Sequence, residues 1–260
     1  MSHPNILVAE AAGVLTLEIS RCDKKNALTS DMYRAMSAAL SHAREHSHVR
    51  VVLIRGQEDL FTAGNDLGDF LNRKVGDPSA AIPFLHLIAA FEKPIVAAVG
   101  GSAVGIGTTM LLHCDLVFAA ENARFQLPFV NLALCPEGAS SLLLPRVAGY
   151  QRAAELLLLG EPFGAAQARE AGFVNRVLPA GELMPAAMDA ARKLAARPAT
   201  SLAMTKALMK RSSDRTAIEA IDEEALFFAE LVAAPAAKEI FAAFLEKRPV
   251  NPEKVHGEGR

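Results

Sequence analysis

Residues 94–112, PIVAAVGGSAVGIGTTMLL, most limit the folds open to this chain. The run is uncharged and nearly as long as a membrane span. Four glycines lie in its interior: Gly100, Gly101, Gly105 and Gly107. Because glycines so placed interrupt a continuous helix, the segment predicts a buried strand at 95–99, a tight turn and a helix starting near Ile106, within a soluble protein.

The composition favours a globular protein that binds a small molecule. At 260 residues and 51% hydrophobic, the chain can form one large domain, or a core with a small appendage. The formal net charge is −2, and Lys and Arg are scattered, so no basic surface for nucleic acid or an anionic membrane is expected.

The three cysteines point to a reducing compartment. Cys22, Cys114 and Cys135 are far apart and not in Cys-x-x-Cys spacing. This pattern argues against a disulfide framework and against a cysteine-based zinc site. We therefore expect a cytoplasmic protein.

Apolar periodicity predicts mixed strands and helices, and therefore an α/β fold. Ile6–Val8 and Val14–Ile19 suggest a hairpin, and Thr29 suits the N-cap of a helix that leads to a strand at Val51–Ile54. Further strands are expected at Leu116–Phe118, Arg124–Leu127 and Phe173–Val177. Further helices are expected at Ile106–His113, around Ala139–Pro145, and at Gln151–Leu159, Ala165–Ala171 and Leu183–Ala196.

The composition changes near Arg197, after which no strand-like run follows. We therefore divide the chain into a core domain, 1–196, and a C-terminal helical region, 197–260, with three helices separated by 212–214 and Pro235. The middle helix carries an apolar stripe made of Ile218, Ile221, Ala225, Phe228 and Val232. Such a stripe is expected to pack on the core or on another subunit.

The glycine-rich turn excludes three common enzyme classes. Gly101-x-x-x-Gly105-x-Gly107 lacks the third glycine of a dinucleotide fingerprint, no Gly-Lys-Ser/Thr follows it, and Ser102 is not in a Gly-x-Ser-x-Gly elbow. What remains is bare backbone at a helix N-terminus, whose free N–H groups can stabilise negative charge on an oxygen. Close backbone packing is the alternative reason for these glycines.

Two further stretches carry possible chemistry. In Phe61-Thr62-Ala63-Gly64-Asn65-Asp66-Leu67, small residues follow a predicted strand and Asp66 is placed to cap a helix, in which Asp69 is expected to be a solvated residue. In LALCPEGASS, residues 132–141, Glu137 is an isolated carboxylate among apolar and small neighbours. Such burial raises a carboxyl pKa and suits an acid or base, although Glu137 could instead stabilise the N-terminus of a helix from Ser140.

Together these stretches resemble the enoyl-CoA hydratase/isomerase (crotonase) superfamily. The three N-terminal motifs that carry the resemblance are Arg21-x-Asp23-Lys24-Lys25-Asn26-Ala27-Leu28-Thr29, Phe61-x-Ala63-Gly64-Asn65-Asp66-Leu67 and Gly101-x-Ala103-x-Gly105-x-Gly107. The similarity continues to Phe244-Leu245-Glu246-Lys247-Arg248 and so covers nearly the whole chain. It implies a crotonase (ClpP-like) superhelix of ββα units with a C-terminal helical region that assembles trimers or dimers of trimers.

The resemblance also implies an acyl-CoA substrate whose thioester oxygen is held by two backbone N–H groups. Matched position by position, these belong to Asn65 and Ile106. Lys24 and Ala27 match positions that contact the CoA adenine and phosphates, and Phe244 and Lys247 match positions that close over CoA. Other matched substrate-binding residues are Ala63, Gly64, Asp66, Leu67 and Gly105.

The sequence departs from the hydratases of this family. They use two glutamates, and Thr109 and Phe129 occupy those positions here. Glu137, within Pro-Glu-Gly-x-Ser-Ser, instead resembles the carboxylate of the peroxisomal type of Δ3,Δ2-enoyl-CoA isomerase, which removes a proton at C2 and returns it at C4. That reaction needs no metal or redox cofactor. The rival hypotheses are hydration or another thioester reaction such as hydrolysis, and a non-catalytic acyl-CoA-binding protein in which Glu137 is only a cap.

Overall fold

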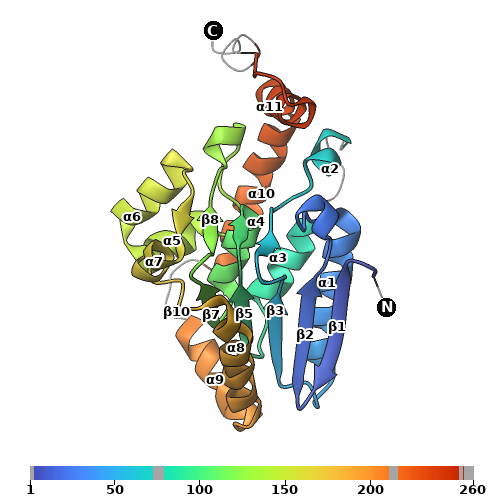
Figure 1. The fold of residues 1–260 in the computed structure, drawn as a ribbon, viewed down its shortest axis with the longest axis vertical. Helices are drawn as coiled ribbons and strands as arrows, with labels where there is room; N and C mark the ends of the chain where they lie inside the picture. The colour runs from blue at the N-terminus through green and yellow to red at the C-terminus, as the bar shows by residue number, and fades with distance from the viewer. Residues whose placement is uncertain (1–2, 73–78, 211–215, 252–253, 255–260) are drawn as a thin grey trace.

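Two sheets form the centre of the protein (Figure 1). The computed structural model describes residues 3–72, 79–210, 216–251 and 254. The larger sheet has the order β1-β2-β3-β5-β7-β10, with β1 antiparallel to β2 and the other neighbours parallel. Its strands are β1 Ile6–Ala11, β2 Val14–Ile19, β3 Val51–Arg55, β5 Ile95–Val99, β7 Leu116–Ala120 and β10 Arg176–Leu178.

The smaller sheet has the order β4-β6-β8-β9. Its strands are β4 Leu60–Thr62, β6 Ser102–Val104, β8 Arg124–Gln126 and β9 Phe163–Gly164. Three successive segments, β3–β4, β5–β6 and β7–β8, each place one strand in the larger sheet and the next in the smaller sheet. The predicted superhelix of ββα units is therefore confirmed.

Helices cover both faces of the larger sheet. On one face, helix α1, Ser30–Glu45, is capped by the Thr29 hydroxyl and buries Met32, Met36 and Leu40. On the other face, α8, Ala180–Ala195, packs Leu183, Ala187 and Ala191 against alternate strand residues. The other core helices are α2 Leu67–Asn72, α3 Ala81–Ala89, α4 Ile106–Thr109, α5 Ser140–Ala148, α6 Tyr150–Ala154 and α7 Ala165–Glu170. Short 3₁₀ turns are η1 Cys22–Lys24, η2 Met110–His113 and η3 Val130–Leu132, and a π-helical turn covers Glu155–Leu159.

The C-terminal region contains three helices in the part that the structure describes, α9 Ala199–Lys210, α10 Ala217–Ala233 and α11 Pro235–Glu246. A capping box between Thr216 and Glu219 starts α10. The apolar stripe of α10 packs on the core of the same chain, where Ile221 and Val232 are buried. The predicted separator at 212–214 lies outside the described residues, and the division at residue 196 stays a prediction.

Several predicted elements differ from the observed ones in bounds or helix type; the helix expected at Gln151–Leu159, for example, becomes a π-helical turn from Glu155. The strand expected at 173–177 begins only at Arg176, because the side-chain Oδ1 of Asn175, rather than a backbone carbonyl, accepts the N–H of Val117 on β7 at 2.7 Å. The helix expected from Ile106 to His113 tightens into a 3₁₀ turn after Thr109. Within the described residues, no helix is both long and apolar enough to cross a membrane.

Candidate active site

Two loops that the sequence singled out touch each other. Gly64 has φ +88°, and a Cβ there would lie 2.6 Å from the carbonyl oxygen of Val104. Its own carbonyl accepts a 2.8 Å hydrogen bond from the N–H of Leu28. Only glycine permits both the left-handed backbone and the close approach, so Gly64 joins the loop after β4 to the turn before α4.

The backbone N–H groups of Asn65 and Ile106 are left free beside this contact. Among the described residues, neither group donates to a protein acceptor. By contrast, the N–H of Asp66, the residue after Asn65, donates to the carbonyl of Leu28. Ile106 is the first residue of α4, where backbone N–H groups have no partner within the helix. The hydroxyl of Tyr33 donates to Oδ1 of Asn65 and so fixes that side chain. Both N–H groups are therefore available to an oxygen of a ligand.

Glu137 is buried with its carboxylate held by one hydroxyl. Its residue exposure is 5%, and Oγ1 of Thr109 donates a 2.6 Å hydrogen bond to its Oε1. Burial raises the pKa of Glu137 to about 8, the Thr109 hydrogen bond opposes the rise, and the charge of Glu224 adds to it. A carboxyl with this pKa exchanges protons near neutral pH, as a general acid or base requires.

Glu224, which the sequence argument missed, occupies the capping role that was the alternative for Glu137. From α10, its carboxylate accepts hydrogen bonds from the N–H of Ala139 at 2.6 Å and the N–H of Ser141 at 3.2 Å, and from the Ser141 hydroxyl. These groups form the N-terminus of α5, where a negative charge is favourable. Glu137 is therefore not needed as the cap of α5.

One small cavity connects Glu137 to Asn65. It is bounded by the segment leading into α3, by the turn at Gly138 and by α10. Its lining residues are Asn65, Ser79, Ala81, Ile82, Glu137, Gly138, Ile221, Glu224, Ala225 and Phe228. Because most of these side chains are apolar or small, and because Glu224 is engaged by α5, Glu137 is the carboxylate in this cavity that is left for chemistry.

A buried histidine supports the turn that carries Glu137. Nε2 of His113 lies 2.8 Å from the carbonyl oxygen of Gly138, so this nitrogen carries the proton. Burial lowers the pKa of His113 to about 4, which keeps the ring neutral. His113 is therefore a neutral, buried histidine whose hydrogen bond supports the turn at Gly138.

The segment matched to CoA binding is tied to the Asn65 loop. Lys24 lies exposed in η1, whereas Ala27 is half-buried and its carbonyl accepts a 2.9 Å hydrogen bond from Nη1 of Arg21. The same nitrogen lies 2.7 Å from Oδ2 of Asp66. The N–H of Ala63 donates to the carbonyl of Lys25 at 2.9 Å, so the segment that contains Lys24 lies beside the segment that leads to Asn65.

Asp66 caps α2, as predicted, because its Oδ1 accepts from the N–H of Gly68 at 2.9 Å. Leu67, the first residue of that helix, packs against the core. Asp69 was expected to be a solvated helix residue, and this was wrong. Its carboxylate accepts a 2.8 Å hydrogen bond from the N–H of Ser30 at the start of α1.

The two matched C-terminal residues lie away from the cavity of Glu137. Phe244 is 67% exposed on α11, and Lys247 ends that helix with φ 54°. Helix α11 lies next to α2 at the upper end of the molecule (Figure 1). The structure therefore places the helix that carries these residues next to α2, but neither residue lines the cavity.

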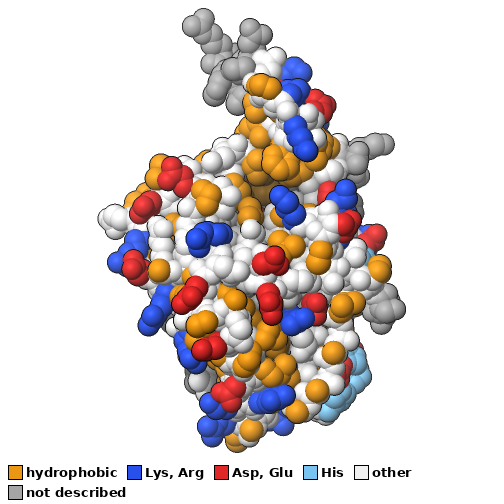
Figure 2. All heavy atoms as spheres, in the orientation of Figure 1, with side chains coloured by type: hydrophobic (Ala, Val, Ile, Leu, Met, Phe, Trp, Pro, Cys, Tyr) orange, Lys and Arg blue, Asp and Glu red, His pale blue; other side chains and the backbone are white. Residues whose placement is uncertain are grey.

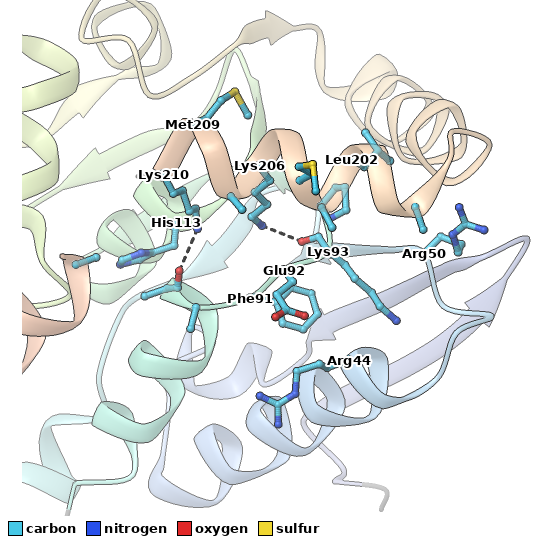
Figure 3. A pocket seen from close by; sticks show the side chains of 18 of the residues that line it. Arg44, Arg50, Phe91, Glu92, Lys93, His113, Leu202, Lys206, Met209 and Lys210 are labelled. Atoms are coloured by element: carbon cyan, nitrogen blue, oxygen red, sulfur yellow. Dashed lines mark hydrogen bonds between the residues drawn. The ribbon is translucent and has the colours of Figure 1, made fainter. Parts of the chain in front are cut away.

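Another hollow lies between the end of α1 and α9, with a volume of about 1630 Å³. Figure 3 shows Lys206 and Lys210 reaching from α9 toward the core, with Arg44 of α1 across from them and Arg50 at the right, beside the start of α9. Nζ of Lys206 is held by the carbonyl of Lys93 at 2.8 Å. Neither Glu137 nor Asn65 lines this hollow, so the two cavities are distinct.

Comparison with known proteins identifies the family. Residues 9–254 match the family model described as enoyl-CoA hydratase/isomerase. Enoyl-CoA delta isomerase 2 of Rattus norvegicus is 33% identical over 226 residues, which are 84% of this chain and 57% of that protein. A probable enoyl-CoA hydratase of Rhizobium meliloti (strain 1021) is 32% identical over 251 residues, 95% of this chain and 97% of that protein. The chain thus spans somewhat more than half of the rat protein and nearly all of the bacterial one.

Solved structures agree with this similarity. An enoyl-CoA hydratase/isomerase from Pseudoalteromonas atlantica T6c matches with a TM-score of 0.89 and 39% identity, over 95% of this chain and 99% of that one. OdaA of Pseudomonas aeruginosa matches with a TM-score of 0.89 and 44% identity, over 94% of this chain and 99% of that one. The chain therefore belongs to the enoyl-CoA hydratase/isomerase (crotonase) family of acyl-CoA enzymes.

Proposed function

We propose that this enzyme is an acyl-CoA isomerase that moves the double bond of a 3-enoyl-CoA to position 2. One observation carries the proposal: the buried carboxylate of Glu137 opens on the same apolar cavity as Asn65. Thr109, which donates to Glu137, stands where a hydratase of the family has a glutamate. A threonine there cannot take a proton from water, so the site favours proton transfer over hydration.

The proposed reaction moves one proton and one pair of π electrons. Ionised Glu137 takes a proton from C2 of the thioester, and the released electrons give a dienolate. Its oxygen accepts hydrogen bonds from the N–H groups of Asn65 and Ile106. Glu137 then returns the proton at C4 and the double bond forms between C2 and C3. No metal or redox cofactor takes part, and coenzyme A enters only as part of the substrate.

The surroundings of Glu137 suit this chemistry. Ile221, Ala225 and Phe228 of α10 form an apolar wall of the cavity, and a dry cavity protects a dienolate from unwanted protonation. Burial also raises the basicity of the carboxylate. The same surroundings therefore serve both the base and the intermediate.

We place the CoA part of the substrate along the exposed surface outside this cavity. Lys24 and Ala27 are proposed to contact the adenine and phosphates, and Phe244 and Lys247 to close over them. We also propose that the protein is cytoplasmic and forms a homotrimer or a dimer of trimers. Native mass measured by light scattering tests the assembly, because a monomeric or dimeric mass would contradict it.

The decisive assay uses 3-hexenoyl-CoA. The wild-type enzyme should form the conjugated 2-enoyl thioester, which is followed by its ultraviolet absorbance. Glu137→Gln should lower the rate by about 10²–10⁴-fold, the usual contribution of a general acid–base group, while circular dichroism stays unchanged. Glu121→Gln, at an exposed carboxylate, is the matched control and should keep the wild-type rate.

Three other outcomes would contradict the proposal. Conversion of crotonyl-CoA to the 3-hydroxy product at a rate above the isomerisation would select a hydratase. Release of free CoA thiol would select a hydrolase. Tight binding of CoA without turnover of any enoyl thioester would select a non-catalytic acyl-CoA-binding protein.

A further inference from the structure

Three metal-ligating side chains meet on the surface at the lower end of the β1–β2 hairpin. They come from three segments: Glu10 from β1, His42 from the last turn of α1, and His48 from the loop before β3. The two carboxylate oxygens of Glu10 lie 2.7 Å from Nε2 of His42 and 2.9 Å from Nε2 of His48. The three ligand atoms all lie within 4.8 Å of one another. Figure 2 shows histidine side chains gathered as a pale-blue patch at this edge of the molecule.

The backbone fixes the loop that presents His48. The N–H of Arg50 donates to the carbonyl of Gly13 in the β1–β2 turn at 2.7 Å. Lys93 Nζ donates to the carbonyls of His46 and Val49, at 2.9 and 2.8 Å. Val49 itself is buried with 1% exposure. These contacts hold the loop beside the hairpin, so the meeting of His48 with Glu10 follows from the fold.

A fourth side chain restrains one of the imidazoles. The ring of His46 stacks on that of His42 with centroids 4.0 Å apart, and Nδ1 of His46 lies 2.9 Å from the carbonyl oxygen of His42. This stacking limits rotation of the His42 ring. The His42 imidazole therefore has little side-chain freedom to lose when its Nε2 gives up its proton and binds a metal ion.

We propose that Glu10, His42 and His48 form a binding site for a divalent transition-metal ion of the Zn²⁺ type. Zn²⁺ binds imidazole nitrogen and carboxylate oxygen at about 2.0–2.2 Å, which in a tetrahedron separates the ligand atoms by roughly 3.3 Å. The present separations, from 2.7 Å to at most 4.8 Å, lie on both sides of that value, so small side-chain rotations suffice. Exposure of the cluster leaves the remaining coordination position to water.

The types of ligand in this site determine which metal ions it should prefer. Mg²⁺ and Ca²⁺ favour shells made of oxygen, whereas two imidazoles and one carboxylate suit Zn²⁺, Ni²⁺ or Cu²⁺. None of the three residues lines the cavity of Glu137. The proposed metal therefore has no part in the isomerisation.

The test is titration of ZnCl₂ into metal-free protein without a histidine tag, followed by isothermal calorimetry. We expect one Zn²⁺ per chain. Substitutions Glu10→Gln, His42→Gln and His48→Gln should each weaken binding by about tenfold or more, because removing even a supporting group of a metal site has an effect of this size. All three side chains are at the surface, so circular dichroism should show an intact fold in each variant. Equal binding by the wild type and the variants, or no binding by the wild type, would overturn the proposal.

Two control variants separate this site from other metal-binding groups. His3→Gln removes a histidine outside the cluster, and Cys22→Ser removes an exposed thiol. Both should bind Zn²⁺ as the wild type does, and a large excess of Mg²⁺ should not compete. Loss of binding in Cys22→Ser, or loss in His46→Gln with binding retained in His48→Gln, would show that the ligands are wrongly assigned.

Discussion

The hydroxyl of Thr109 donates a 2.6 Å hydrogen bond to the carboxylate of Glu137. Both residues are buried, so the bond forms where water cannot easily replace it. A donor to a carboxylate stabilises its ionised form, whereas burial stabilises its neutral form. The balance between the two determines the pH at which Glu137 becomes a base, and it can be tested from both sides.

Removal of the hydroxyl in Thr109→Val should raise the pKa of Glu137 above its value of about 8. In the proposed reaction the rate depends on ionised Glu137, so the rise of kcat with pH should move to higher pH. Thr108→Val is the matched control, because the Thr108 hydroxyl donates to the carbonyl of Ala103 instead. A midpoint that stays in place in Thr109→Val would show that the hydrogen bond does not tune the base.

Removal of the nearby charge in Glu224→Gln should act in the opposite direction. The charge of Glu224 raises the pKa of Glu137, so its loss should move the rise of kcat to lower pH. The same variant weakens the cap on α5 and should lower the free energy of unfolding by about 1–3 kcal/mol. The pH profile of kcat and urea denaturation measure the two effects, and a shift of the profile to higher pH would contradict this account.

The raised pKa of Glu137 also predicts how stability depends on pH. Folding favours the neutral carboxyl, so the cost of burying Glu137 grows as pH rises from 4.5, its ordinary pKa, through about 8. Glu137→Gln removes that cost. Its free energy of unfolding should therefore exceed that of the wild type by up to about 5 kcal/mol above pH 8, and by much less below pH 4.5. Urea denaturation at both pH values measures this, and an equal difference at both would refute it.

Gly64→Ala should disturb the proposed oxyanion site. The added Cβ would lie 2.6 Å from the carbonyl oxygen of Val104, at a backbone φ of +88° that alanine rarely adopts. The loop must shift, so kcat/KM should fall by about 10–100-fold as the N–H of Asn65 moves. In Gly181→Ala the new Cβ meets nothing within 4 Å, and this helical control should keep full activity. Equal activity of both variants would argue against a role for this loop.

Features with a local pattern were predictable from the sequence. Thr29 caps α1 because a hydroxyl preceding a periodic apolar run suits that position. The strand at Ile95–Val99 was predicted with its observed bounds, because an apolar run bounded by proline and glycine is typical of a buried strand. The burial of Glu137 followed from its apolar neighbours.

Features that depend on contacts distant in the sequence were not predictable. Glu224 lies 85 positions from Ala139, which donates its backbone N–H to the Glu224 carboxylate. No residue pattern near Glu224 indicates that this group is its partner. One signal was available, because Glu224 is an acidic residue three positions after Ile221 on the apolar face of α10. The prediction for Asp69 was wrong for the same reason, because the residue that donates to its carboxylate, Ser30, is 39 positions away. Local periodicity shows which face is buried but not which group will meet it.

The link from Glu224 to α5 also bears on the order in which the protein is made. A ribosome delivers Glu137 first and Glu224 only after a further stretch of chain that includes α9. Until α10 emerges, the turn that carries Glu137 has neither its hydrogen bonds to Glu224 nor the cavity wall that Phe228 provides. A nascent chain interrupted before residue 224 would contain the loops of Asn65 and Ile106 and the carboxylate of Glu137. Its cavity, however, would lack the wall that α10 provides and would be open to water. The cavity beside Glu137 is thus closed only after α10 has been made.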